Sequence, residues 1–174
     1  MKYFYVFLLV CMCQLSNAQS RIRQYIEKHK EETLALADSF EIPASIIIGT
    51  AIMESGAGSS KTSKLLNNHF GIIGKNNLAK RKPPVKTKYK QFETVHDSYV
   101  AFCRIVKRKK FYKKLKGENN YTKWVDAISK AGYSTSPGIW KNEMLKTIKK
   151  YKLDKLDKPS TGTHEEEQAS VNKK

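Results

Sequence analysis

The residue best placed for acid–base chemistry in this sequence is Glu54, which directly follows a long apolar stretch. Residues 44–53 contain only two polar side chains, a serine and a threonine, so a helix over them would be apolar nearly all round and therefore buried. Gly56 and Gly58 follow at once, and glycine just past a helix commonly closes the last turn in the left-handed conformation. The pattern predicts a buried helix with Glu54 in its last turn.

Two effects at that position favour the protonated form of the Glu54 carboxyl group. They are partial desolvation by the apolar helix and the negative end of the helix dipole. Both raise the pKa of the carboxyl, and a raised pKa lets it donate a proton near neutral pH. The alternative is a glutamate that caps its helix against a nearby lysine, and the helix by itself does not separate the two interpretations.

Motifs that begin at Glu54 and continue downstream favour the catalytic interpretation. In chain order they are Glu54-Ser55-Gly56-x-Gly58, Asn67-Asn68-x-Phe70-Gly71-Ile72, Tyr89-x-x-Phe92 leading to Asp97-Ser98-Tyr99, Phe111-Tyr112-x-x-Leu115, and Ala131-Gly132-Tyr133-x-Thr135-x-Pro137. Together they resemble the core of the bacterial N-acetylglucosaminidases of glycoside hydrolase family 73, a group that includes flagellar and autolytic peptidoglycan hydrolases. The similarity spans roughly residues 22 to 151.

The resemblance implies a fold and a set of site residues. The fold class is α+β but mainly α, a lysozyme-like single domain with a small β-lobe formed by the basic loop of residues 75–90. Asn68, Phe70, Gly71 and Tyr99 are implied to bind substrate, and Tyr133 to contribute to the active site. The alternatives are a turn with one core aromatic for the asparagine and phenylalanine, and a packing role for the tyrosine after the helix.

One departure from the family pattern concerns the second carboxylate that most glycosidases use. The family usually carries a second glutamate in the β-lobe, but here the matching stretch is Lys86-Thr87-Lys88, and residues 55–92 contain no Asp or Glu. Either the carboxylate has moved, with Glu93 the nearest candidate, or the enzyme works with one acid and the N-acetyl group of its substrate. A third option is a chain that has lost catalysis and only binds glycan.

The helices that must position these residues are also visible in the sequence. Apolar residues recur at spacings of three and four between Ser20 and Phe40, which predicts an amphipathic helix. The segment Thr94-x-x-Asp97 resembles a capping box at the start of another helix. Cys103 in that helix lies at helical spacing among apolar residues, so we interpret it as a buried structural cysteine. No cluster has the spacing of metal ligands, and no cofactor is expected.

The two ends of the chain differ from its middle. Residues 1–18 combine a lysine, an apolar run and a small-x-small site at Ser16-Asn17-Ala18, which predicts a signal peptide removed before Gln19. The apolar run is shorter than the roughly twenty residues of a membrane-spanning helix, which disfavours the alternative of a retained anchor. We expect a catalytic domain over residues 19–154 and a disordered tail over 155–174, because the tail has too few apolar residues to offset the entropy of ordering.

The charge of the chain bears on its partners. The formal net charge is +17, and removal of a signal peptide with a single lysine leaves +16. Such a balance implies a polyanionic neighbour, but no nucleic-acid motif is present, so an anionic bacterial envelope suits it at least as well. The basic loop of residues 75–90 would either hold acidic glycan or peptide stems or form a solvated face.

From these observations we expect an exported protein, periplasmic or secreted, that acts as a monomer on peptidoglycan glycan strands. It would cleave the β-1,4 bond after N-acetylglucosamine, with Glu54 as general acid. A muramidase or lytic transglycosylase of the same fold, or a catalytically silent wall-binding module, would share most of these features.

Overall fold

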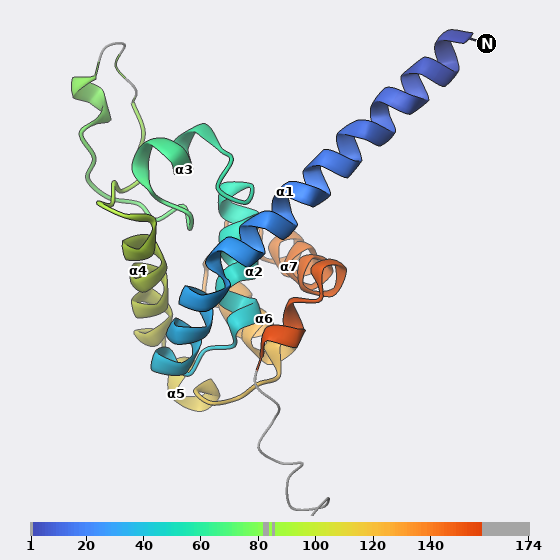
Figure 1. The fold of residues 1–174 in the computed structure, drawn as a ribbon. Helices are drawn as coiled ribbons and strands as arrows, with labels where there is room; N and C mark the ends of the chain where they lie inside the picture. The colour runs from blue at the N-terminus through green and yellow to red at the C-terminus, as the bar shows by residue number, and fades with distance from the viewer. Residues whose placement is uncertain (1, 82–83, 85, 158–174) are drawn as a thin grey trace, which may run out of the picture.

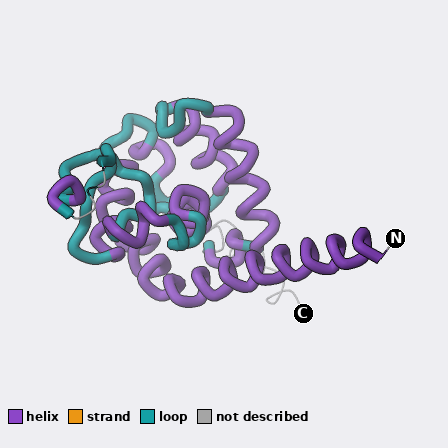
Figure 2. The backbone as a smooth tube through the Cα atoms, turned by 90° about the horizontal axis from the view of Figure 1, so that it is seen from above, coloured by secondary structure: helices purple, strands orange, loops and turns teal. Residues whose placement is uncertain are grey.

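The computed structural model describes the backbone of residues 2–81, 84 and 86–157, and the side chains from Gln19 onward within those ranges. The helices are α1 (Lys2–Phe40), α2 (Ala44–Ser55), α3 (Lys61–Leu66), α4 (Val95–Lys107), α5 (Tyr112–Leu115), α6 (Tyr121–Lys130) and α7 (Pro137–Tyr151), with 3-10 turns η1 (Leu78–Lys80) and η2 (Leu153–Leu156). The helices pack around α2, and the loop segments gather on the side opposite the projecting N-terminal part of α1 (Figures 1 and 2). The mainly helical, lysozyme-like fold is confirmed.

Helix α2 occupies the centre of this arrangement (Figure 1), in contact with α1, α4, α6, α7 and η2. Its isoleucines 46, 47 and 48 are fully buried, so they face neighbours on all sides of the helix. Burying each such side chain contributes about 1.5–3 kcal/mol. The helix ends as predicted, because Gly56 takes the left-handed conformation with φ 59° and donates its N–H to the carbonyl of Ile52.

The start of α2 is capped from the far end of the chain. Pro43 precedes the helix and offers no side-chain cap. Instead, the backbone N–H and the hydroxyl of Ser45 donate to the two carboxylate oxygens of Asp157 at 2.8 and 2.6 Å. Residues 155–157 therefore belong to the folded domain, which corrects the boundary predicted at residue 154. The remainder of the predicted tail, residues 158–174, lies outside the described residues.

Helix α1 is longer than the predicted amphipathic segment. It runs without a break from Lys2 to Phe40, and its first half projects from the body of the molecule (Figure 1). The predicted signal peptide is thus continuous with the helix that packs on α2, and its removal stays a prediction. Within the described part of the chain, no helix is long and apolar enough to cross a membrane.

The small β-lobe predicted for residues 75–90 is not confirmed. Ile73 and Tyr89 form one isolated antiparallel bridge, flanked by three backbone hydrogen bonds of 2.7–3.0 Å between residues 72–75 and 88–91. The described residues form no longer strand. The two prolines of this segment have no backbone N–H, so neither can donate to a ladder. Three residues of the basic loop, Lys82, Pro83 and Val85, lie outside the described residues.

Other local predictions are confirmed. Thr94 and Asp97 form the capping box of α4, in which each side chain accepts a hydrogen bond from the backbone of the other residue. Cys103 is buried, and burial raises the pKa of its thiol to about 12, as suits a structural cysteine. Pro137 lies in the first turn of α7, and the side chain of Ser136 before it makes no capping hydrogen bond.

The cap on α2 gives a first prediction. Asp157→Ala should lower the free energy of unfolding by about 1 kcal/mol, the usual cost of losing an N-cap side chain. Burial raises the pKa of Asp157 to about 6, above its unfolded value of 3.8. The stabilising contribution is therefore largest at acidic pH, and the difference between the variant and the wild type should shrink as the pH rises through 6. Urea unfolding at several pH values measures it.

Asp154→Ala serves as the matched control, because this exposed carboxylate lies in the 3-10 turn that directly precedes Asp157 and makes no side-chain hydrogen bond to α2. Equal effects of the two substitutions would contradict the capping role.

Candidate active site

An open cavity of about 460 Å³ lies at the C-terminal end of α2. Its walls come from the end of α2, the start of α3, the loop after α3, the segment around the Ile73–Tyr89 bridge and the loop before α7. The lining residues are Glu54, Ser60, Thr62, Ser63, Asn68, Gly71, Ile73, Lys88, Tyr89, Tyr133, Ser134 and Thr135. Hydroxyl and aromatic groups thus surround a single carboxyl group, a composition suited to binding a sugar.

Glu54 presents its carboxyl group to this cavity from the last turn of α2. The Nε1–H of Trp140 in α7 donates a hydrogen bond to Glu54 Oε1 at 3.1 Å. Partial burial raises the pKa of Glu54, and the hydrogen bond from Trp140 lowers it by a smaller amount. The net shift is upward, so the carboxyl retains its proton closer to neutral pH than an ordinary glutamate does.

The alternative for Glu54, a helix-capping pair with lysine, is not what the structure shows. Among the described residues no lysine forms an ion pair with Glu54, and Trp140 is the hydrogen-bond partner of its side chain. A neutral donor from a neighbouring helix orients the carboxyl while leaving its other oxygen available. This is the arrangement required of a proton donor at the edge of a cavity.

Gly71 lies directly against the acid. Its φ of 62° falls in the left-handed region, and a Cβ built on it would lie 3.4 Å from Glu54 Oε2. A Cβ there would come into van der Waals contact with the carboxyl, and any side chain at this position would strain the backbone. The structure brings the predicted site residues Glu54 and Gly71 together.

Asn68 is buried beside the cavity, and its amide is used within the protein. The Nδ2 group donates to the carbonyls of Ile72 and Lys90 at 2.9 and 2.8 Å, and Oδ1 accepts from the backbone N–H groups of Phe70 and Ile72. These bonds fold the loop that carries Gly71 and join it to the opposite extended segment. Asn68 therefore shapes the cavity, rather than offering its amide to a sugar as predicted.

Phe70 and Tyr99, which the family resemblance implied to bind substrate, lie in the core of this structure. Phe70 is 2% exposed and stacks on Phe102 with ring centroids 4.5 Å apart, while Tyr99 is fully buried and meets Phe70 edge to face. Both rings point into the core because α4 packs its apolar face against α2 and the loop. Burial of large aromatic surface outweighs any use of these rings in the cavity.

Tyr133 borders the cavity and holds its wall. The hydroxyl donates to the backbone carbonyl of Phe70 at 3.0 Å, and the ring packs against Trp140 and Phe102. Burial and the nearby charge of Glu54 raise the pKa of Tyr133 far above its usual value, so the hydroxyl stays protonated. Tyr133 thus links the loop beside Gly71 to the helix that carries Trp140.

Glu93 lies away from the Glu54 cavity. It is exposed and lines a different hollow, together with residues 75–77, 91 and 92. Among the described residues that line the Glu54 cavity, Glu54 is the only carboxylate, and Lys88 occupies the segment where the family pattern places a second one. The geometry does not support Glu93 as a displaced second carboxylate.

Trp140 is the functional residue that sequence reasoning missed. Its side chain is buried. Its hydrogen bond to Glu54 joins residues 86 positions apart, and no local sequence pattern predicts such a contact. The available signal was its position in the first turn of the helix that follows Tyr133.

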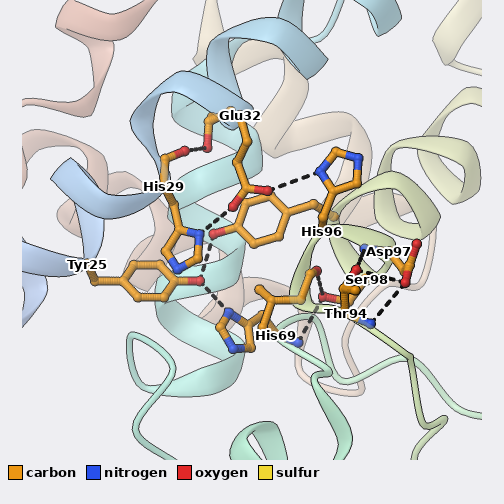
Figure 3. A network of polar contacts seen from close by, with 11 residues as sticks. Tyr25, His29, Glu32, His69, Thr94, His96, Asp97 and Ser98 are labelled. Atoms are coloured by element: carbon orange, nitrogen blue, oxygen red, sulfur yellow. Dashed lines mark hydrogen bonds and ion pairs between the residues drawn. The ribbon is translucent and has the colours of Figure 1, made fainter.

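A buried polar network stands behind the loop of residues 67–72 (Figure 3). The hydroxyl of Tyr25 in α1 lies 2.7 Å from both His69 Nδ1 and the hydroxyl of Tyr99. We call these three residues the Tyr–His–Tyr chain. It ties α1, α4 and the loop together. No group of His, Cys, Asp and Glu in the described residues is arranged to hold a metal ion.

The fold and the site together define a lysozyme-like glycoside hydrolase, in which the end of a buried helix presents an acid to a cavity. A family profile described as mannosyl-glycoprotein endo-beta-N-acetylglucosaminidase matches residues 30–153, most of the chain. The chain belongs to this glucosaminidase family.

Individual relatives agree with this membership. The exo-glucosaminidase LytG of Bacillus subtilis (strain 168) is 26% identical over 150 residues, which cover 76% of this chain and 52% of LytG. The chain thus spans about half the length of this relative.

Two solved structures share the fold. The catalytic domain of the autolysin Auto from Listeria monocytogenes superposes with a TM-score of 0.65 at 17% identity, covering 79% of this chain and 88% of that one. The glycoside hydrolase domain of FlgJ from Salmonella typhimurium gives a TM-score of 0.58 at 16% identity, covering 87% and 96%. At such low identity the two structures establish the fold alone.

The contact between Trp140 and Glu54 gives a second prediction. A general acid works only while protonated, so the rate of glycoside hydrolysis should fall as the pH rises through the pKa of Glu54. Trp140→Phe removes the hydrogen bond that favours the Glu54 carboxylate, so the pKa of Glu54 should rise. The alkaline limb of the pH–rate profile should then move to higher pH. A pH–rate profile measures the shift.

Trp124→Phe is the matched control. This tryptophan is also buried, but its Nε1–H donates to the backbone carbonyl of Glu118, and the substitution should leave the limb in place. A limb that stays fixed in Trp140→Phe, or moves to lower pH, would contradict the assigned role of the contact.

Proposed function

We propose that this protein is an exported peptidoglycan hydrolase that cleaves the β-1,4 bond after N-acetylglucosamine, with Glu54 as its general acid. The observation that carries the proposal is the placement of Glu54, with its raised pKa, in an open cavity against the backbone of Gly71. A carboxylic acid in that setting is poised to protonate a departing glycosidic oxygen.

In the proposed reaction the Glu54 proton moves to the glycosidic oxygen as the bond between that oxygen and the sugar C1 breaks. Trp140 holds the carboxyl in place through Oε1 and stabilises the carboxylate that results. Positive charge develops on the sugar ring as the bond lengthens. The negative Glu54 carboxylate, now close by in the cavity, stabilises that charge.

The other face of the sugar needs a nucleophile, and the described lining residues offer no second carboxylate. Lys88 cannot replace it, because an ammonium group donates hydrogen bonds but has no lone pair to give. We assign this step to the substrate, whose 2-N-acetyl carbonyl oxygen attacks C1 and forms a ring. Water then opens that ring at C1, and Glu54 takes back one proton of the water, which restores the starting enzyme.

Peptidoglycan as the substrate is supported by several independent features. The family is a glucosaminidase family, and the relatives include proteins named as an exo-glucosaminidase and an autolysin. The positive net charge of the chain suits an anionic wall, and the apolar N-terminal segment supports export.

The third prediction compares three variants on one peptidoglycan preparation. Glu54→Gln keeps the shape of the side chain but removes the proton, so the rate should fall about a hundredfold or more. Glu93→Gln should stay near the wild-type rate, because Glu93 lines another hollow. Tyr133→Phe should lose several-fold, because one hydrogen bond to the loop is worth about 1 kcal/mol. Release of soluble fragments gives the rates.

The ends of the released fragments identify the bond. A reducing N-acetylglucosamine end in mass spectrometry is the expected product. A reducing muramic acid end would indicate a muramidase, and an anhydro end a lytic transglycosylase. Full activity of Glu54→Gln would end the general-acid assignment, whereas protein bound to intact sacculi without fragments would indicate a wall-binding module.

A further inference from the structure

A second cavity, of about 360 Å³, lies on the other side of the start of α3. Its lining residues are Arg21, Gln24, Tyr25, Lys28, His29, Ala57, Gly58, Ser63, Lys64, Asn67, His69 and Val95. Ser63 contributes to the walls of both this cavity and the Glu54 cavity. Only the first turn of α3 therefore separates the two, and one extended ligand could reach both.

The second cavity is positively charged. Arg21 and Lys28 of α1 and Lys64 of α3 lie on its rim, exposed to solvent. Within the described part of the chain none of the three forms an ion pair, and no Asp or Glu lines the cavity. The rim therefore carries three cations whose charge the protein does not neutralise.

The carboxylate of Glu32 in α1 is already paired inside the protein. Glu32 pairs with His29 through one carboxylate oxygen and with His96 through the other, at 3.1 Å in the second case (Figure 3). These contacts hold the pKa of Glu32 below its ordinary value. Glu32 thus belongs to the packing between α1 and α4, and it does not face the cavity.

The floor of the cavity contains a buried imidazole. His69 is 6% exposed, and its Nδ1 lies 2.7 Å from the Tyr25 hydroxyl, which in turn lies 2.7 Å from the Tyr99 hydroxyl. If Tyr99 donates to Tyr25 and Tyr25 donates to Nδ1, both hydroxyl oxygens and Nδ1 have a partner. The proton of the neutral imidazole is then on Nε2, which makes Nε2 a donor.

Gly58 leaves that edge of the ring open. A Cβ on Gly58 would lie 3.1 Å from His69 Cε1 and 3.5 Å from Nε2, and the φ of +69° also favours glycine. Burial, together with the positive charges nearby, lowers the pKa of His69 to about 4. At neutral pH the ring therefore stays neutral and presents one N–H donor beneath the three cations.

We propose that this second cavity is an anion subsite, which takes a carboxylate carried on a side branch of the glycan strand whose sugars occupy the Glu54 cavity. A carboxylate oxygen would accept from His69 Nε2–H, while the guanidinium of Arg21 and the ammonium groups of Lys28 and Lys64 supply the positive field. The inference rests on the proposed function, since peptidoglycan carries such carboxylates on its stem peptides.

The fourth prediction tests this subsite by binding, without turnover. In a Glu54→Gln background, the full chain should bind a stem-bearing peptidoglycan fragment more tightly than a neutral N-acetylglucosamine oligomer of equal sugar number. The further triple change Arg21→Gln, Lys28→Gln and Lys64→Gln should remove that preference, a loss of about tenfold if each exposed pair contributes about 0.5 kcal/mol. Binding of the neutral oligomer should not change.

The control is a second triple variant, Lys113→Gln, Lys114→Gln and Lys149→Gln. These exposed lysines line neither cavity, and the variant has the same net charge as the first. If both triple variants lose the preference for the stem-bearing fragment equally, the preference comes from the overall positive charge of the protein, and the subsite is overturned. A preference that survives the first triple variant would overturn it as well.

Two further measurements locate the anion and separate the two proposals. The NMR signals of the His69 ring nitrogens should shift when the stem-bearing fragment is added but not with the neutral oligomer. Unchanged signals with the stem-bearing fragment would contradict the assignment. Inorganic phosphate should compete for the subsite if the fragment binds there through its anion. If the protein binds the neutral oligomer without any preference for stems, only the subsite fails, whereas failure to bind either glycan would overturn the proposed function too.

Discussion

The burial of α2 is the constraint on which the rest of the structure depends. Because the helix is apolar on every side, it is stable only when α1, α4, α6, α7 and η2 cover it together. That enclosure leaves one end open, and there the chain places a carboxyl group. The packed core fixes the position of Glu54, and partial burial raises the pKa of its carboxyl. The packing that stabilises the domain therefore also keeps this carboxyl protonated closer to neutral pH.

The loop after α3 connects the packed core to the Glu54 cavity. Asn68 folds the loop through its amide, and Tyr133 fixes it from the far side through the carbonyl of Phe70. The Tyr–His–Tyr chain holds its inner face against α1 and α4. One short segment therefore forms the wall of the Glu54 cavity through Gly71 and the floor of the neighbouring basic cavity through His69.

The distribution of charge around these cavities accounts for the proposed chemistry. A lone acid beside a lysine suits a reaction in which the protein donates the proton and the substrate supplies its own nucleophile. The cations around the second cavity have a separate task in this proposal, since none of them forms an ion pair within the described residues. In this view catalysis depends on the enclosed acid, and selection of the strand depends on exposed cations whose influence salt would weaken.

The sequence by itself determined the features whose causes are local. An apolar helix ended by Gly56, an acid in its last turn and the Thr94–Asp97 capping box all follow from residues within a few positions of one another. Only the tertiary structure decided which way Phe70 and Tyr99 point, because a ring in a loop or helix can face either core or cavity until its neighbours are packed. The same holds for the hydrogen bond from Trp140 and the cap from Asp157, which join residues 86 and 112 positions apart. Such contacts arise when the core brings distant segments together, and no periodicity in the chain encodes them.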